Sequence, residues 1–217
     1  FYHHAAWLYG FGGRLLDAEG NPALDDPANR DSLAFVAELT EHDLVPREPN
    51  GALVTQLFNE GRAAMVINGP WFLGEIEKGV DYGVSPLPDV SATGLPATPL
   101  LTVESAIVSS HAGNHRGAVD LALFLARDGA HTRLTEGMQV VTEPAAWNCR
   151  EKIPAALVQF KVQADRARLM PNSPVVRSMW EPASRALRAV LRGSATPDQA
   201  LQRAQQQVMI ATRPPPA

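Results

Sequence analysis

The stretch between residues 57 and 79 constrains the fold of this chain more than any other, and it reads LFNEGRAAMVINGPWFLGEIEKG. The residues Asn59-Glu60-Gly61 are typical of a helix end, because glycine adopts a left-handed cap conformation at little cost. The run Ala63–Ile67 is short, apolar and bounded by turn-forming residues, which predicts a β-strand buried on both faces. Pro70 is suited to the first position of a following helix.

Trp71 follows this predicted strand, where the carboxyl end of the strand meets the start of a helix. In open α/β sheets, ligands bind at that edge. A large aromatic side chain at this place has two interpretations. It could cover the hydrophobic core, as most tryptophans are at least partly buried, or it could offer a platform to a flat, apolar ligand surface.

The rest of the chain contains regular patterns as well. Asp26-Pro27 predicts a helix start, and residues 100–109 (LLTVESAIVS) predict a long β segment. Asn114 can cap a helix that runs to Arg127 and is apolar on most sides, which indicates burial against more than one neighbour. Helical spacing near the carboxyl end predicts two further helices, with one apolar face each formed by Val176, Met179, Trp180, Ala183, Leu187 and Val190, and by Leu201, Ala204 and Val208.

Three motifs occur in the same order as in a known family. NEGRAAMVINGPW ends at Trp71 and is followed by Tyr82-Gly83-Val84 and Pro86-Leu87-Pro88, MPNSP at 170–174 precedes Trp180, and Phe1-Tyr2 stands ten residues before Gly12-Gly13. In these motifs the chain resembles the maltose-binding-protein-like solute-binding proteins of ABC importers. The resemblance extends over nearly the whole chain, but it matches only the second part of a typical member.

The resemblance implies an α/β fold of the two-lobed periplasmic binding protein type, with mostly the second lobe present. Residues 1–101 and 148–217 would form this second, C-terminal lobe. Residues 102–147 would be a crossing segment that contributes to the first lobe, whose remaining parts would lie outside these residues. Phe1 begins within sequence that reads as folded, without a signal peptide, so we expect a piece of a longer protein.

The resemblance also implies a sugar site. Aromatic rings bind sugars because the C–H groups of a pyranose pack flat on a π-face, while nearby polar groups hydrogen-bond the hydroxyls. Trp71, Trp180 and Tyr2 match the stacking positions of the family, although core packing is the alternative interpretation for Trp180. Trp7 and Trp147 match no stacking position.

Glu104, Asn172 and Arg185 are expected as polar neighbours of the ligand. The sequence departs from the family pattern at the last of these positions. Where close maltodextrin binders carry an arginine, this chain has Ser184, and Arg185 stands one residue later. One residue on a helix rotates a side chain by about 100°, so we do not expect Arg185 to fill that role unaided.

Composition and motifs disfavour other classes of function. The formal net charge of −4, without a basic block, argues against nucleic acid or an anionic membrane as the main partner. No apolar run approaches the roughly 18 residues that span a bilayer, so no direct membrane insertion is expected within this chain. Cys149 is the only cysteine, and the adjacent His3 and His4 lack the spacing of metal ligands. Asp25-Asp26 fits a turn and helix cap better than a catalytic pair.

We therefore expect a binding protein without catalytic residues, metal or cofactor. It would bind an oligosaccharide, with maltose or maltodextrin as the expected sugar, and deliver it to an ABC importer permease. The protein would be periplasmic or extracellular, and associated with the membrane through the transporter. The alternative is a lobe that is fused to, or docks on, a transporter and has little sugar binding of its own. An enzyme that acts on glycans through Glu60 or Glu143 is disfavoured.

Overall fold

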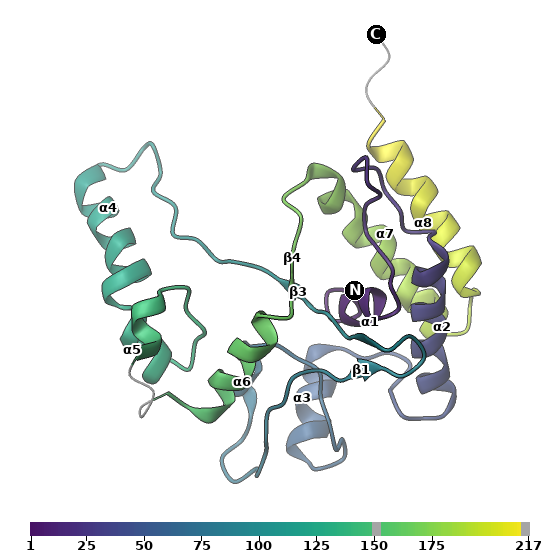
Figure 1. Cartoon of the computed structure of the whole chain (residues 1–217), viewed down its shortest axis with the longest axis horizontal. Helices are drawn as coiled ribbons and strands as arrows, with labels where there is room; N and C mark the ends of the chain where they lie inside the picture. Colours follow the sequence, from purple (N-terminus) through teal and green to yellow (C-terminus); the bar gives the residue numbers. More distant parts are fainter. Residues whose placement is uncertain (149–152, 214–217) are drawn as a thin grey trace. The chain divides into compact units, whose positions relative to one another are not determined.

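The computed structural model describes residues 1–148 and 153–213 and contains two compact units (Figure 1). Cys149 and residues 214–217 of the proline-rich tail lie outside the described residues. Unit 1 comprises Phe1–Val54, Leu87–Leu101 and Ala167–Ala217, and unit 2 comprises Thr55–Pro86 and Thr102–Arg166. The expected division into lobes stays a prediction.

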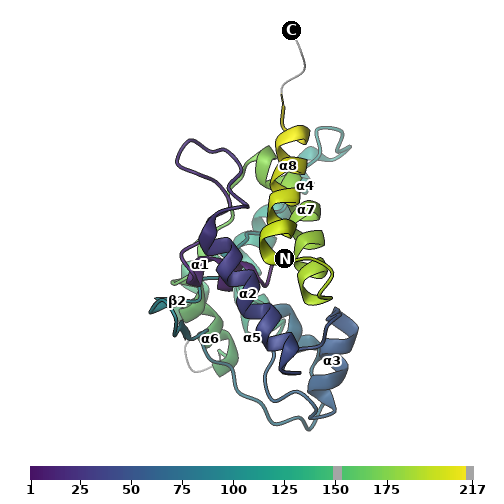
Figure 2. The same cartoon turned by 90° about the vertical axis from the view of Figure 1, so that its right-hand side faces the viewer.

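Unit 1 contains helices and two very short strand pairs. Its helices are α1 (Ala5–Gly10), α2 (Pro27–Glu41), α7 (Pro174–Leu191) and α8 (Pro197–Ala211), and α3 (Gly51–Asn59) begins in this unit and ends in unit 2. The strands β1 (Asp89–Val90) and β2 (Leu95–Pro96) pair antiparallel, and β3 (Leu100–Leu101) and β4 (Arg168–Leu169) pair parallel. The helices α7 and α8 lie side by side in both views (Figures 1 and 2).

The helix starts of unit 1 follow from local sequence, and the predicted start at Asp26-Pro27 is confirmed. The carboxylate of Asp26 accepts a hydrogen bond from the backbone N–H of Ala28, with Pro27 at the first helical position. Ser173 caps α7 in the same way, with its hydroxyl oxygen 3.3 Å from the nitrogen of Val175. Thr196 and Gln199 form a capping box at the start of α8. Each cap satisfies backbone donors that a helix end otherwise leaves unpaired.

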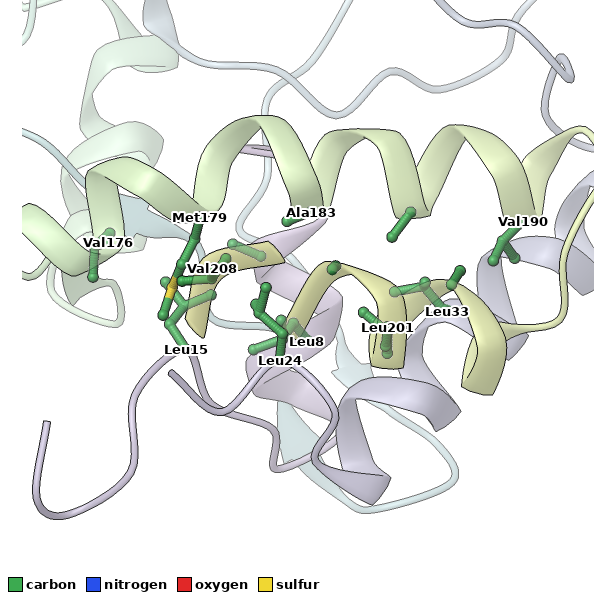
Figure 3. Close-up of a cluster of buried hydrophobic side chains, with 14 of the residues drawn as sticks. Leu8, Leu15, Leu24, Leu33, Val176, Met179, Ala183, Val190, Leu201 and Val208 are labelled. Atoms are coloured by element: carbon green, nitrogen blue, oxygen red, sulfur yellow. The ribbon is translucent and has the colours of Figure 1, made fainter. Parts of the chain in front are cut away.

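The core of unit 1 lies between α7, α8 and the amino-terminal helices. The buried face of α7 is packed against that of α8 and against leucines of the first 33 residues, as Figure 3 shows for Leu8, Leu15, Leu24, Leu33, Val176, Met179, Ala183, Val190, Leu201 and Val208. The predicted inward positions are confirmed for Val176, Met179, Ala183 and Val190 of α7, and for Leu201, Ala204 and Val208 of α8. Burial of a leucine or valine side chain stabilises the fold by about 1.5–3 kcal/mol.

The buried side-chain amide of Asn29 holds the loop over residues 14–24 in place. The side-chain nitrogen of Asn29 donates to the carbonyl oxygens of Arg14, Ala23 and Leu24 at 2.8, 2.8 and 3.2 Å. Its side-chain oxygen accepts from the backbone N–H of Arg14 at 3.0 Å. Asn29 therefore fixes the loop over residues 14–24 against α2 and satisfies backbone groups that no regular ladder pairs.

The regular elements of unit 2 among its described residues are helices, and the unit has a small core. Its elements are η1, a 3₁₀-helix (Pro70–Glu75), α4 (His115–Leu123), η2, a π-helix (Phe124–Asp128), α5 (Ala130–Thr135), η3, a second 3₁₀-helix (Pro144–Asn148), and α6 (Ala155–Ala164). The buried core residues are Ala130, Leu134, Val141, Ala146 and Leu157. In both units, among residues 1–148 and 153–213, no helix has the length and apolar character that a membrane crossing requires.

The prediction of a buried strand over Ala63–Ile67 is wrong. These residues form no strand, and the side chain of Met65 is 86% exposed. A strand buried on both faces needs hydrogen-bonded neighbours and covering layers, and no described segment pairs with this run. The turn and helix that follow are close to expectation, because Gly61 has a φ of 67° and Pro70 begins η1.

The predictions for residues 100–127 are only partly correct. Only Leu100–Leu101 forms a strand, and Ile107 in the extended remainder is 89% exposed. Asn114 caps α4 as expected, through a hydrogen bond from the N–H of Gly117. However, Leu121 and Phe124 are exposed rather than buried. Nothing among the described residues covers them, so an all-round apolar pattern identified a helix but not its burial.

Candidate functional site

Unit 1 brings together aromatic rings from the two ends of the chain. The ring centroids of Tyr2 and Trp180 lie 6.4 Å apart at an interplanar angle of 42°. Phe1 meets Trp180 edge to face, with 6.0 Å between centroids and an angle of 72°. All three side chains are half-buried. Such pairs add stabilisation beyond the area they bury and still leave ring surface open to a ligand.

The short parallel pair β3–β4 positions Tyr2 and Trp180 within this cluster. The hydroxyl of Tyr2 donates a hydrogen bond of 2.9 Å to the carbonyl oxygen of Leu100 in β3. After β4, the N–H of Met170 donates to the carbonyl oxygen of Leu101 at 3.0 Å, which fixes the start of the MPNSP loop. That loop ends at the cap of α7, and Trp180 stands on this helix beside the buried Met179. The pairing of β3 with β4 therefore fixes the backbone segments that place the rings of Tyr2 and Trp180.

His4 lies buried behind the cluster. Its Nε2 is 3.1 Å from Oγ of Ser32, and its ring centroid is 5.6 Å from that of Phe1. Burial lowers the pKa of His4 to about 3, because the charged imidazolium would lose its hydration. His4 is thus neutral near pH 7 and supports the rings as a packed side chain.

Trp71 belongs to unit 2, where it is 53% exposed. It is therefore not a core residue of this unit. The next residue, Phe72, is buried and meets the ring of Phe58 at 5.8 Å between centroids. The contact between Phe58 and Phe72 anchors η1 to α3, and it therefore holds the backbone next to Trp71 in place.

Polar contacts that the sequence did not reveal anchor the other end of η1. The side chain of Asn59 donates to the carbonyl oxygen of Glu75 at 2.9 Å and accepts from the N–H of Glu77 at 3.2 Å. The hydroxyl of Thr55 donates to the carboxylate of Glu75 at 2.6 Å. Since these partners are far apart in sequence, no local spacing rule could have identified them.

The expected polar neighbours lie in different settings. Arg185 is exposed and ion-paired with Glu181, with 3.0 Å between Nε and Oε1. It stands five residues after Trp180, which places it about 140° further around α7. Asn172 is exposed in the loop before α7, and Glu104 is exposed in the extended segment after β3, in unit 2.

The structure thus divides the six expected site residues between the two units. Tyr2, Asn172, Trp180 and Arg185 belong to unit 1, and Trp71 and Glu104 belong to unit 2. Within unit 1, the rings of Tyr2 and Trp180 are in contact with each other. Phe1 was missed as a member of the aromatic cluster, although its place beside Tyr2 is a usable signal.

The other two tryptophans have structural surroundings. Nε1 of Trp147 donates to the carbonyl oxygen of Val141 at 3.0 Å, and the ring packs on the core of unit 2. Trp7 meets Phe35 edge to face at 5.1 Å.

Unit 2 also has an open hollow of about 340 Å³, lined by Arg127, Asp128, His131, Glu143, Ala145 and Ala146. Glu143 accepts a hydrogen bond from the N–H of Ala145 there, which is the geometry of a turn cap.

Comparison with known protein families assigns the chain to one of them. A family model described as bacterial extracellular solute-binding protein matches residues 1–148, well over half of the chain. The chain belongs to this family. Among curated relatives, this solute-binding protein is 28% identical to a galactooligosaccharide-binding protein of Bacillus subtilis over 94% of its own residues. It is 24% identical to a maltotriose-binding protein of Pyrococcus abyssi over 88%.

Solved structures agree with this assignment. The maltose/maltodextrin-binding domain MalE from Bdellovibrio bacteriovorus, bound to maltotriose, matches 98% of this chain at 26% identity with a TM-score of 0.82. The maltose-maltodextrin binding protein of Alicyclobacillus acidocaldarius matches 96% at 24% identity with a TM-score of 0.84, which shows the fold alone. The solute-binding protein thus has the α/β fold of the two-lobed periplasmic type.

The chain spans only part of the proteins that it matches. It covers 51% of the Bacillus and 44% of the Pyrococcus relative, and 58% and 59% of the two structures. The share of the structures fits one lobe of a two-lobed protein better than two complete lobes.

Proposed function

We propose that this chain is the sugar-binding part of a periplasmic or extracellular protein that captures an oligosaccharide and delivers it to an ABC importer permease. The observation that carries the proposal is the contact between Tyr2 and Trp180, two half-buried rings from distant segments. Membership in the solute-binding family supports it. So do the two relatives whose names state oligosaccharide binding.

The chemistry of the residues supports a sugar rather than a charged solute. Trp180 with Tyr2, and Trp71 in the other unit, offer aromatic surface on which pyranose C–H groups can stack. Glu104 and Asn172 would bind hydroxyls through their exposed polar groups. Arg185 would do so only after giving up its ion pair with Glu181, which at an exposed position costs little.

An α-glucan such as maltose or maltodextrin is the sugar that we propose. The motifs around Trp71 and Trp180 favour it. So does the similarity to a domain bound to maltotriose, at 26% identity. The galactooligosaccharide-binding relative makes galactose-containing oligomers the competing class. The role is capture and release without chemistry on the sugar.

One group of observations favours a second candidate function. Ile107, Leu121 and Phe124 expose large apolar surface in unit 2, and such surface usually marks an interface. Under the main proposal, this apolar surface packs against a first lobe, to which residues 102–147 contribute and which further sequence would complete. Under the second candidate function, the surface docks on a transporter and the lobe has little sugar binding of its own.

Calorimetric titration of the full-length protein decides between these functions. Maltotriose, a galactooligosaccharide and glucose are titrated under the same conditions. Saturable binding of maltotriose, and not of glucose, supports capture of an α-glucan. Preference for the galactooligosaccharide corrects the sugar class only. Absence of binding by all three overturns the capture function and leaves the docking lobe as the better account.

A further inference from the structure

Gly69 lies directly under the indole ring of Trp71. A methyl group built on Gly69 would lie only 2.5 Å from Cζ2 of Trp71 and still nearer to Cη2 and Cζ3. A point that is almost equally close to three successive ring atoms lies over the face of the ring and not beside its edge. The hydrogen that a side chain would replace therefore points at the face of the indole.

The backbone at this position does not itself require glycine. Gly69 has a φ of −94° and a ψ of 177°, an extended conformation that every residue adopts. Pro70 restricts the preceding residue to this region, and the side chain of Asn68 accepts a hydrogen bond of 2.9 Å from the N–H of Gly69. The direction of any side chain at position 69 is thus set, so the indole would have to move.

We propose that Gly69 is a positioning residue for Trp71, and that it holds the indole flat against the loop backbone. One face of the six-membered ring rests on Gly69, while 53% of Trp71 remains exposed. A ligand that stacks on the indole would then meet a ring in a fixed orientation. The orientation of the ring stands on the geometry alone, whereas its use for sugar binding rests on the proposed function.

The chain supplies a matched control for this idea. Gly74 lies in η1, three residues after Trp71, and a methyl group on it would meet nothing within 4 Å. Gly74→Ala therefore makes the same chemical change near the same tryptophan without touching the ring. Gly69→Ala and Gly74→Ala both reduce the freedom of the unfolded chain, so a difference between them reports the clash.

The experiment compares Gly69→Ala and Gly74→Ala in the full-length protein, each with Trp71 retained and with Trp71→Ala added. Acrylamide quenching of fluorescence, taken as the difference between the forms with and without Trp71, isolates the indole. We expect Gly69→Ala to change the quenching of Trp71 and to lower the melting temperature, and we expect the loss of stability to disappear in the Trp71→Ala background. Gly74→Ala should do neither. Equal quenching in the two glycine variants overturns the proposal.

Titration with maltotriose tests the use of the ring. We expect Gly69→Ala to weaken binding about tenfold, which corresponds to about 1.4 kcal/mol, and to add nothing to the effect of Trp71→Ala. Unchanged affinity in Gly69→Ala with a displaced ring overturns the binding role. If the wild type binds no sugar, the proposed function is overturned. The quenching comparison then still supports or overturns the placement of the indole.

Discussion

The hydroxyl of Tyr2 donates a hydrogen bond to the carbonyl oxygen of Leu100, and this bond holds the ring of Tyr2 beside Trp180. The strand of Leu100 also pairs with β4, from which the chain continues into α7. One short parallel pair thus controls both sides of the aromatic contact. Changes at β3 should therefore affect binding without any direct contact with a sugar.

Removal of the Trp180 ring should weaken sugar binding. Trp180→Ala should cost about 1–3 kcal/mol, the range for a large apolar contact in a largely buried site, which is about a five- to 150-fold loss of affinity. Calorimetric titration with maltotriose measures it. Because Trp180 also packs on the core of unit 1, Trp180→Phe serves as a milder variant that keeps an aromatic ring at this position. Wild-type affinity in a folded Trp180→Ala protein would contradict the assignment.

Trp71 should affect affinity and not stability, because its side chain is more than half exposed. We expect Trp71→Ala to lower affinity within the same range of about 1–3 kcal/mol. The melting temperature of the unliganded protein should change by only a few degrees. Trp147→Phe is the control, since Nε1 of Trp147 holds the carbonyl of Val141. It should lower the melting temperature and leave affinity unchanged. The reverse pattern in these two variants would show that Trp71 is structural.

Asn29 should be a principal polar contributor to the stability of unit 1. Asn29→Ala leaves the backbone groups of Arg14, Ala23 and Leu24 without their buried partner, and we expect a loss of about 2–4 kcal/mol in the free energy of unfolding. Urea unfolding measures this loss. The control is Asn21→Ala, because Asn21 is exposed and its side-chain amide donates a hydrogen bond to Asp17 at the surface. Equal effects of both variants would refute the role of Asn29.

His4 should make the protein less stable in mild acid. Its folded pKa, lowered to about 3 by burial, lies below the unfolded value of 6.5, so protons bind the unfolded chain more readily. The contribution is present in full above the unfolded pKa and is lost as the pH falls from about 6.5 towards 3. Between pH 7 and 5 the loss should be about 2 kcal/mol. Urea unfolding of wild type and His4→Gln at both values tests this. An equal pH dependence in the two proteins would exclude His4 as the cause.

Residues 1–217 produced alone should associate or unfold readily. Ile107, Leu121 and Phe124 expose apolar surface, which favours association in water. Light scattering and a thermal melt measure the outcome, and replacement of Leu121 and Phe124 by glutamine should raise the monomer fraction. A soluble monomer with one cooperative transition would contradict the expectation.

Local chemistry in the sequence determined the helix starts, the capping residues and the inward faces of α7 and α8. Asp26, Ser173 and Thr196 bond backbone groups two or three residues away, so short-range patterns are sufficient to predict them. The family motifs also predicted the fold class and the class of protein. These features depend on neighbours in the chain or on a motif that can be read directly.

Only the tertiary structure decided the burial of the apolar runs and the contacts of the site. Ala63–Ile67 and the apolar residues of α4 and η2 have the composition of buried elements. Burial, however, depends on what else covers them, and Met65, Leu121 and Phe124 remain mostly exposed among the described residues. The sequence also did not predict the hydrogen bond from Tyr2 to Leu100 or the contact between Gly69 and the Trp71 indole. They depend on the direction in which a backbone points a ring or a hydrogen atom, and no residue pattern records that direction.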